Sequence, residues 1–395
     1  MTDIRRNGIH AVEKDVEAIE KQIKAHRIKV AAVIISIIVV IALAILGYYF
    51  YCNSKSYTNY ITRSRIERND GTENYDRVAG YLLKYNNDGA ALYDLNNNGI
   101  WNQAYEMQEP LVKINGSYVA IADREGTRVY IFDTEGMIGD ITTTSMIENI
   151  SIASQGTLAV LMEDDGTSYI KLFDKTGSNI ASGAIHLSNG SFPMNLALSP
   201  DATKLGVSMI DISNGKVATT IAFYNFGSVG QNEIDNIVGS YTYEDELLPE
   251  IFYPTNDKML AVGSKMMVVY TGNQRPAESD VLPLDGEAKM VFHDSKYMGF
   301  IYEDENTTDD TLKIYDMSGA KKLEMSVAAG FEKAYFLENH EVCMLSDSRA
   351  YIYTLSGKRK FYYNFDDMIY YILSDKGITG YTFILKDFTE KVLLK

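Results

Sequence analysis

The hydrophobic pattern of the chain changes once, near residue 53. Residues 30–51 (VAAVIISIIVVIALAILGYYFY) hold no charged side chain, whereas short runs of Val, Ile, Tyr and Phe alternate with Gly, Asn and Asp beyond that point. A helix rises about 1.5 Å per residue, so residues 30–51 are long enough to cross a hydrocarbon core of about 30 Å. The first segment predicts one transmembrane helix, and the second predicts an all-β domain.

The flanks of the apolar segment predict an uncleaved anchor rather than a secretory signal. A signal has an apolar region of about 7–15 residues followed by a cleavage site, whereas this run is longer and ends in the aromatic residues 48–51, which suit a membrane–water interface. Lys and Arg are more frequent in residues 1–29 than just after the run. Because such residues favour the inner side, we expect a cytoplasmic segment 1–29, a transmembrane helix 30–51 and a C-terminal domain outside the cell membrane.

The cytoplasmic segment shows apolar residues at the a and d positions of one heptad register. They include Val12, Val16, Ile19 and Ile23. β-Branched residues at the a position suit a parallel two-stranded coiled coil. These positions predict a helix with a possible homodimer seam, and an amphipathic helix without a partner is the alternative.

The β region repeats one unit, an apolar strand that ends in an aromatic or aliphatic residue followed by Asp, Asn or Thr and then a Gly. The clearest copies end in Asp133, Asp174 and Asp316, and weaker copies end in Asp94, Asn225, Thr271, Thr354 and Asp387. The spacing of roughly 40–50 residues is typical of four-stranded propeller blades. Asp bonds the backbone ahead of it in such a turn and Gly accepts a positive φ, so the repeated Asp is interpreted as a structural anchor.

The repeats predict an all-β propeller of about eight four-stranded blades, with seven as the alternative. A strand within residues 57–68 is expected to complete the last blade, which would remove the exposed sheet edges. The expected domains are a juxtamembrane linker with a first strand (52–76) and the propeller ectodomain (77–395). In the turn that begins at Ser199, Ala202 replaces the Gly of a Ser-Pro-Asp-Gly pattern, and Ala is costly at positive φ.

One stretch, residues 223–239, departs from the repeat through its glycines and amides. Gln231, Asn232 and Asn236 lie past the expected turn, and loops on a rigid scaffold are where recognition residues concentrate. The stretch therefore predicts a partner or ligand surface, and a structural bulge is the alternative. Trp101, the only tryptophan, follows a turn Gly and is expected to pack between blades.

Composition removes several classes of function. The formal net charge is −16, and an acidic surface repels nucleic acid. The five His residues show no metal-ligand spacing, no Gly-x-Ser-x-Gly elbow occurs, and Cys52 and Cys343 are too few for a disulfide framework. No catalytic, metal-binding or cofactor-binding residue is assigned, and no cofactor is expected.

Four segments together resemble a known group: residues 101–110 (WNQAYEMQEP), 120–123 (AIAD), 199–201 (SPD) and 223–232 (FYNFGSVGQN). They are similar to an uncharacterised domain-of-unknown-function family of single-pass membrane proteins with a propeller-like ectodomain, from Gram-positive anaerobic bacteria. The resemblance implies a bacterial cell-envelope setting. It implies no established activity, so no catalytic residue is carried over.

These observations favour a membrane-anchored extracytoplasmic propeller that acts as a binding or scaffold module. The expected partner is an envelope protein or a wall component. One alternative is a quinoprotein-like or lyase-type enzyme with its site in the central channel, which the absence of metal spacings disfavours. Another is a signal transducer that senses a ligand outside the membrane.

Overall fold

The computed structural model describes the chain except for residues 1–2, 69–73, 186–190, 213–214, 304–307 and 376, and except for the side chains of residues 3–20, 22, 49, 52, 53 and 184. It separates into two units. The first holds residues 1–56 with 377–379, and the second holds residues 57–376 and 380–395. Each unit is described by itself.

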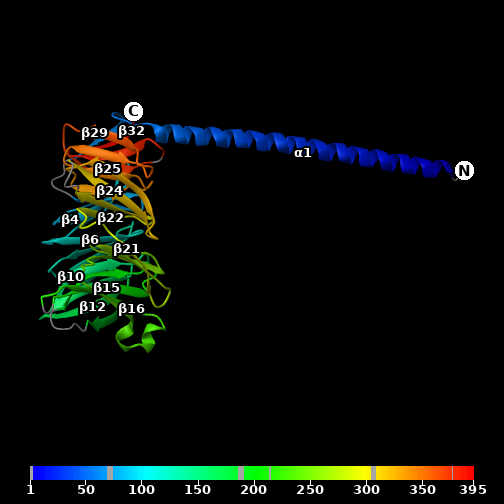
Figure 1. Cartoon of the computed structure of the whole chain (residues 1–395). Coiled ribbons are helices and arrows are strands. Elements are labelled where there is room, and N and C mark those ends of the chain that lie inside the picture. Colours follow the sequence, from blue (N-terminus) through cyan, green and yellow to red (C-terminus); the bar gives the residue numbers. More distant parts are fainter. Residues whose placement is uncertain (1–2, 69–73, 186–190, 213–214, 304–307, 376) are drawn as a thin grey trace. The chain divides into compact units, whose positions relative to one another are not determined.

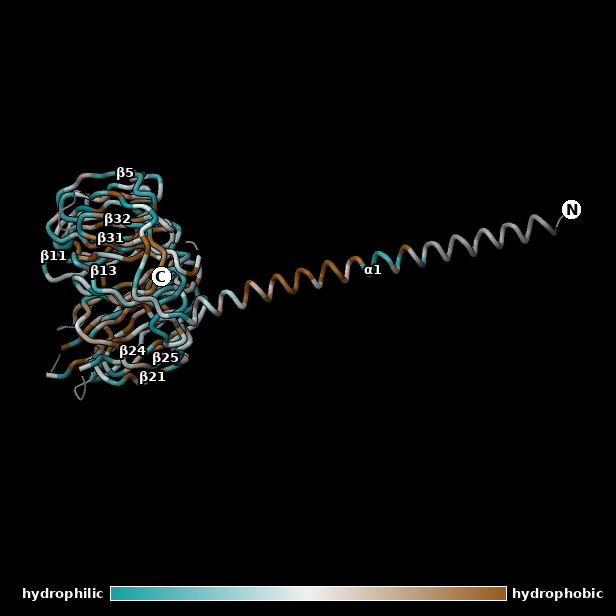
Figure 2. Tube along the Cα trace, turned by 90° about the horizontal axis from the view of Figure 1, so that it is seen from above, coloured by the Kyte–Doolittle hydropathy of each residue, from teal (hydrophilic) through white to brown (hydrophobic). Residues whose placement is uncertain are grey.

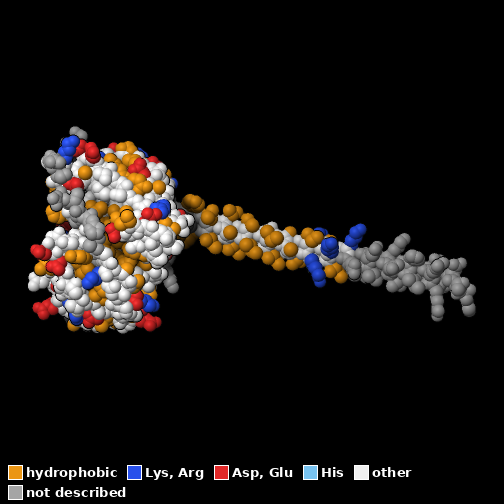
Figure 3. Space-filling model, turned by 90° about the horizontal axis from the view of Figure 1, so that it is seen from below, with side chains coloured by type: hydrophobic (Ala, Val, Ile, Leu, Met, Phe, Trp, Pro, Cys, Tyr) orange, Lys and Arg blue, Asp and Glu red, His pale blue; other side chains and the backbone are white. Residues whose placement is uncertain are grey.

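The first unit is dominated by one helix, α1 (Asp3–Ser54). Its stretch Ile23–Tyr48 has a mean hydropathy of 3.2 and is long and apolar enough to cross a membrane, by length and composition. The hydrophobic run is brown in Figure 2, and in Figure 3 Lys and Arg side chains lie on its N-terminal side. The large apolar side chains of this stretch are exposed, which suits an apolar environment. Such a helix fits a membrane anchor or a signal sequence.

The second unit consists of eight four-stranded antiparallel sheets, here called blades 1–8 in chain order. Blade 1 holds β2 (Asn74–Val78), β3 (Tyr81–Tyr85), β4 (Gly89–Tyr93) and β5 (Gly99–Ala104). Blade 2 holds β6 (Pro110–Asn115), β7 (Tyr118–Asp123), β8 (Arg128–Phe132) and β9 (Met137–Thr142). Blade 3 holds β10 (Met146–Ile152), β11 (Leu158–Asp164), β12 (Thr167–Phe173) and β13 (Asn179–Ala184). Blade 4 holds β14 (Ser191–Leu198), β15 (Lys204–Asp211), β16 (Ala218–Asn225) and β17 (Ile237–Glu244).

The remaining four blades continue in chain order. In Figure 1 the colours run from cyan in blade 1 to red in blade 8. Blade 5 holds β18 (Glu250–Thr255), β19 (Lys258–Val262), β20 (Met266–Thr271) and β21 (Ala277–Pro283). Blade 6 holds β22 (Met290–His293), β23 (Tyr297–Glu303), β24 (Asp309–Asp316) and β25 (Lys321–Ala328). Blade 7 holds β26 (Lys333–Phe336), β27 (Val342–Leu345), β28 (Arg349–Tyr353) and β29 (Arg359–Asn364). Blade 8 holds β30 (Ile369–Ser374), β31 (Gly380–Leu385) and β32 (Phe388–Leu394), and β1 (Tyr60–Glu67) is its fourth strand.

The pairing of β1 with β32 closes the ring and confirms the predicted eight-bladed propeller with an N-terminal closing strand. Glu390 on β32 is fully buried. It accepts hydrogen bonds from Arg65 Nε at 2.5 Å and Thr62 Oγ1 at 3.1 Å, both on β1. A buried carboxylate is stable only when such partners are present, so these bonds favour this strand pairing. The domain boundary expected at residue 77 falls inside β2, and β1 belongs to the propeller.

The core lies between adjacent blades. Each of eight buried apolar clusters joins two neighbouring blades, and the last cluster joins Leu82 of blade 1 to Ile384 of blade 8. Middle strands such as β7 and β8 are buried on both faces, which explains their nearly continuous apolar sequences. Trp101 also links two blades: its ring stacks on Phe132 at 4.7 Å, and its Nε1 donates to the Asp133 carbonyl at 3.1 Å.

The repeated Asp lies after the third strand of a blade and organises the following turn. In Asp174, Oδ1 accepts the backbone N–H groups of Thr176 at 2.8 Å and Ser178 at 3.0 Å. The Thr176 hydroxyl also donates to it, and these hydrogen bonds lower the pKa of Asp174. Oδ1 also accepts hydrogen bonds from backbone N–H groups of the following turn at Asp94, Asp133, Asn225 and Asp316.

The weaker repeat copy at Asp387 was placed wrongly. Asp387 lies between β31 and β32, the second and third strands of blade 8, rather than after a third strand. The reason is the closure, because β1 supplies the fourth strand and the third strand ends at Leu394. The turn at Ser199 forms with Ala202 in the left-handed conformation, at φ 56°.

Candidate functional site

The stretch that breaks the repeat forms an insertion between β16 and β17. It contains two short 3-10 helices, η1 (Gly230–Asn232) and η2 (Ile234–Asn236). The chain must pass close to its own backbone here, because a Cβ on Gly230 would lie 1.6 Å from the carbonyl oxygen of Asn225. Two links hold the insertion to blade 5: Asn225 Nδ2 donates to the Gln274 carbonyl at 2.8 Å, and Arg275 pairs with Glu233.

The three amides predicted as a partner surface take different places in this insertion. Gln231 and Asn232 are exposed on η1, and Asn232 Nδ2 bonds locally to the Ser228 carbonyl at 2.7 Å. Asn236 is half-buried on η2 and lines a pocket. Asp235, which sequence reasoning did not select, lines the same pocket and adopts a positive φ of 55°.

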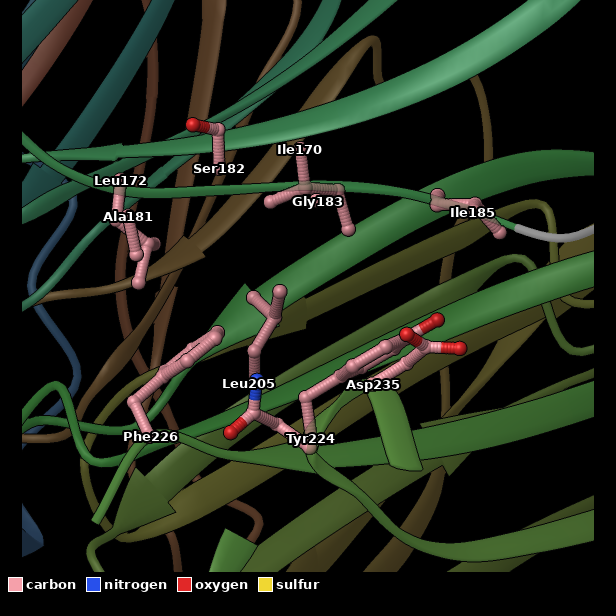
Figure 4. A pocket seen from close by; sticks show the side chains of 11 residues that line it. Ile170, Leu172, Ala181, Ser182, Gly183, Ile185, Leu205, Tyr224, Phe226 and Asp235 are labelled. Atoms are coloured by element: carbon pink, nitrogen blue, oxygen red, sulfur yellow. The ribbon is translucent and has the colours of Figure 1, made fainter. Parts of the chain in front are cut away.

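The pocket lies between blades 3 and 4 and has a volume of ≈ 160 Å³ (Figure 4). Its walls are mainly apolar. Blade 3 contributes Ile170, Leu172, Ala181, Ser182, Gly183 and the following Ile185, and blade 4 contributes Leu205, Tyr224 and Phe226. The remaining lining residues are Asp235 and Asn236 of η2. Burial, with a smaller effect of the Asp235 carboxylate, raises the pKa of Tyr224 to about 12, so this hydroxyl stays neutral. The pocket is therefore an apolar cavity with a polar edge, hereafter the interblade pocket.

Two further cavities, here together called the channel, lie among the inner strands of the ring. A cavity of ≈ 440 Å³ is lined from β6, β10, β14, β18 and β22, and an adjacent one of ≈ 230 Å³ is lined from blades 1, 6, 7 and 8. Some of their polar lining groups have partners, either in the lining or on an adjacent residue. Asn149 Nδ2 donates to Asn195 Oδ1 at 3.0 Å, and His340 Nδ1 lies 2.5 Å from Asp294 Oδ2.

The smaller cavity holds an ion pair, and the larger one holds an aromatic stack. Arg77 pairs with Glu338 in the smaller cavity, and the His293 ring stacks on Phe252 with centroids 3.8 Å apart. Within the part of the chain that the structure describes, no group of three or more His, Cys, Asp or Glu side chains could hold a metal ion. The larger cavity has a more polar lining, which includes Lys113 and Glu250, whereas the interblade pocket has mainly apolar walls.

A comparison with known protein families identifies the family to which this sequence belongs. Residues 53–394 match the family of unknown function DUF5711. The chain belongs to the DUF5711 family. Together with the propeller and the single apolar helix, this confirms the resemblance to a domain-of-unknown-function family. No curated protein matches the DUF5711 chain in sequence.

Solved structures similar to this DUF5711 chain are propellers of the BamB and WD40 kinds. Saccharomyces cerevisiae Sqt1 has a TM-score of 0.51 at 11% identity, over 87% of this chain and 100% of that one. BamB from Moraxella catarrhalis has a TM-score of 0.48 at 13% identity, over 85% and 100% of the two chains. The Neurospora crassa Pan2 WD40 domain has a TM-score of 0.46 at 8% identity, over 86% and 97%. Identities this low show the fold alone.

The expected homodimer seam of this DUF5711 chain lies on α1. The side chains of Val12, Val16 and Ile19 fall outside the described residues, although the backbone there is helical. The side chain of Ile23 is described and is 49% exposed. The seam therefore remains a prediction.

Proposed function

We propose that this protein is a membrane-anchored, extracytoplasmic binding module of the bacterial cell envelope, and that it captures a protein partner in the interblade pocket. The observation that carries this proposal is the pocket itself, with apolar walls from two blades and a polar edge from η2. Ile234, next to the pocket-lining Asp235, is 86% exposed. A partner that fills the pocket would also cover this side chain and remove its apolar surface from water, which favours binding.

The size of the pocket indicates what a partner would place in it. An apolar cavity of about 150 Å³ can hold a benzene molecule, so a pocket of ≈ 160 Å³ has room for one large apolar side chain. Burying such a side chain contributes about 1.5–3 kcal/mol. The carboxylate of Asp235 and the amide of Asn236, which line the polar edge, would lie beside the backbone of that segment. We therefore infer that the partner presents a short segment with one apolar anchor.

The proposed membrane anchoring and extracytoplasmic location are inferred from α1 and from its flanking charges. The stretch Ile23–Tyr48 has the length and hydropathy of a membrane span. Lys and Arg are concentrated before it, which favours a cytoplasmic N-terminus. The propeller would then lie outside, and its partner would be an envelope protein or a wall component.

Gly183 allows the proposal to be tested with one substitution. A Cβ at this position meets no atom within 4 Å, and the backbone does not have a positive φ. Gly183→Leu should therefore place apolar bulk in the pocket without backbone strain, and the denaturation midpoint should stay at or above that of the wild type. The amount of protein crosslinked to the full-length chain in cells should fall at least fivefold.

Val281→Phe is the matched control, because it adds bulk to an exposed position on the outer strand of blade 5. This variant should retain its crosslinked partners. If Gly183→Leu folds like the wild type and keeps the same partners in the same amount, the pocket is only a gap in packing and the proposal is wrong.

A further inference from the structure

A separate apolar surface lies at the N-terminal ends of the inner strands. Met146 on β10 and Phe192 on β14 are each 59% exposed, and Leu247, ahead of β18, is 40% exposed. Ile212, at the end of β15, is 54% exposed. Three consecutive blades thus present large apolar side chains at the same end of the ring, and we call Met146, Phe192, Ile212 and Leu247 the apolar arc.

Hydrogen bonds between the inner strands show that these positions correspond. Asn149 of blade 3 donates to Asn195 of blade 4, and Asn195 Nδ2 donates to the Pro249 carbonyl at 3.0 Å, just before blade 5. Both asparagines follow a β-bulge. Met146 and Phe192 each lie three residues before their asparagine, so they occupy equivalent positions on neighbouring strands.

The other two members of the apolar arc, Ile212 and Leu247, lie at the same end of blade 4 as Phe192. Phe192 pairs with Ile210, and Ile210 pairs with Thr219 on the next strand. The Thr219 hydroxyl donates to the Glu246 carbonyl at 2.7 Å and accepts the Leu248 N–H at 3.2 Å. The loop that carries Leu247 is therefore held against the end of the sheet on which Phe192 and Ile212 lie.

Two carboxylates lie beside the Met146 end of the arc. Glu163 lies opposite Met146 in the strand register, and Glu148 is two residues along β10. Burial, and then the charge of Glu163, raise the pKa of Glu148, whereas the charge of Arg124 lowers it. Lys171 and Lys265 also lie at this end, where they donate to the Thr144 hydroxyl at 3.1 Å and to the Asp245 carbonyl at 2.6 Å.

We propose that the apolar arc docks a basic amphipathic segment of a partner protein, with its apolar side chains on Met146, Phe192 and Leu247 and its Lys or Arg side chains beside Glu148 and Glu163. An amphipathic helix fits this pattern, because it presents apolar side chains on one face and charged side chains on the other. The charge complementarity distinguishes this occupant from a second copy of the chain, whose corresponding surface is also acidic. This docking is independent of the interblade pocket.

The test uses a fluorescent peptide of about 18 Leu and Lys residues arranged as an amphipathic helix. Full-length protein in phosphatidylcholine nanodiscs should raise the anisotropy of this peptide above that of empty nanodiscs. Met146→Ser with Phe192→Ser should weaken binding at least tenfold. Glu148→Gln with Glu163→Gln should weaken binding and reduce its dependence on salt. Gly183→Leu, in the interblade pocket, should leave the peptide affinity unchanged.

Several outcomes would overturn the docking proposal. No binding beyond empty nanodiscs, equal binding of a Leu and Glu peptide, or unchanged affinity in the Met146 and Phe192 variant would each reject it. A wild-type particle that dimerises through this face, and becomes monomeric in the same variant, would identify a second copy as the occupant. Because these positions are exposed, the variant should keep the denaturation midpoint of the wild type.

Discussion

A buried ion pair in blade 7, whose carboxylate also bonds a tyrosine of blade 8, leads to a prediction about stability. Lys360 on β29 donates to Glu341 Oε1 at 2.5 Å, and the hydroxyl of Tyr381 on β31 donates to the other carboxylate oxygen. The side chains of Lys360 and Glu341 are 1% and 9% exposed. Lys360 and Glu341 belong to blade 7 and Tyr381 to blade 8, so this carboxylate lies at the junction of the two blades.

Lys360→Met should destabilise the propeller by about 3–5 kcal/mol. Met keeps most of the aliphatic volume of Lys, so the main effect is a buried carboxylate that loses its counter-charge, and breaking a buried pair from one side costs about that much. Adding Glu341→Gln removes the unpaired charge, while the amide oxygen still accepts from Tyr381. Because removing both charges is often neutral or stabilising, the double variant should recover at least half of the loss.

The free energy of unfolding can be measured by chemical denaturation of the full-length chain in detergent, with linear extrapolation to zero denaturant. Lys321→Met is the matched control, because its pair with Glu324 is 51% and 42% exposed, and such surface pairs contribute little to stability. The reasoning is refuted if Lys360→Met costs no more than Lys321→Met, or if the double variant is as unstable as Lys360→Met alone.

Four further predictions concern topology, assembly, pH and a turn. Protease added to intact, wall-stripped cells should digest the chain beyond residue 52 and spare an N-terminal tag, and a protected C-terminus would contradict the proposed location. Val16→Asn with Ile23→Asn should lower crosslinking between full-length chains, and unchanged crosslinking would reject the dimer seam. Burial raises the pKa of Asp76 from 3.8 to about 6, so stability should fall as pH rises from about 4 to about 6. Asp76→Asn should therefore raise the free energy of unfolding at pH 7.5 by as much as about 3 kcal/mol and change it little at pH 4. An equal effect at both pH values would contradict this prediction. Ala202→Gly should stabilise by about 0.5–1 kcal/mol by relieving the positive φ, and a destabilised variant in the same denaturation assay would show that this turn carries no strain.

Much of the fold could be predicted because each blade repeats the same local chemistry. An apolar strand followed by Asp174 or Asp316 marks a third strand and its turn, and these marks recur at the spacing of one blade. The rule failed at Asp387 because the last blade takes its fourth strand from the start of the chain. The local sequence pattern does not indicate that β1, from the start of the chain, supplies the fourth strand of the last blade.

The candidate site was predicted less completely, since it combines residues from two blades. The broken repeat located the insertion and Asn236, but the opposite wall of the pocket comes from Gly183 and its neighbours on the preceding blade. Nothing in the local sequence of β13 marks it as one side of a pocket. Gln231 and Asn232 were selected by their polarity, whereas the structure places them on η1 and outside the pocket lining.

The most direct test of the account is a photo-crosslinking measurement at the edge of the interblade pocket. A photoreactive residue replaces Ile234, which is 86% exposed, in the full-length protein of living cells. The account predicts one predominant adduct with an extracytoplasmic protein, and the same adduct should be lost when Gly183→Leu is added. An adduct that persists at full yield in the Gly183→Leu chain, or an adduct formed with a cytoplasmic protein, would contradict the account.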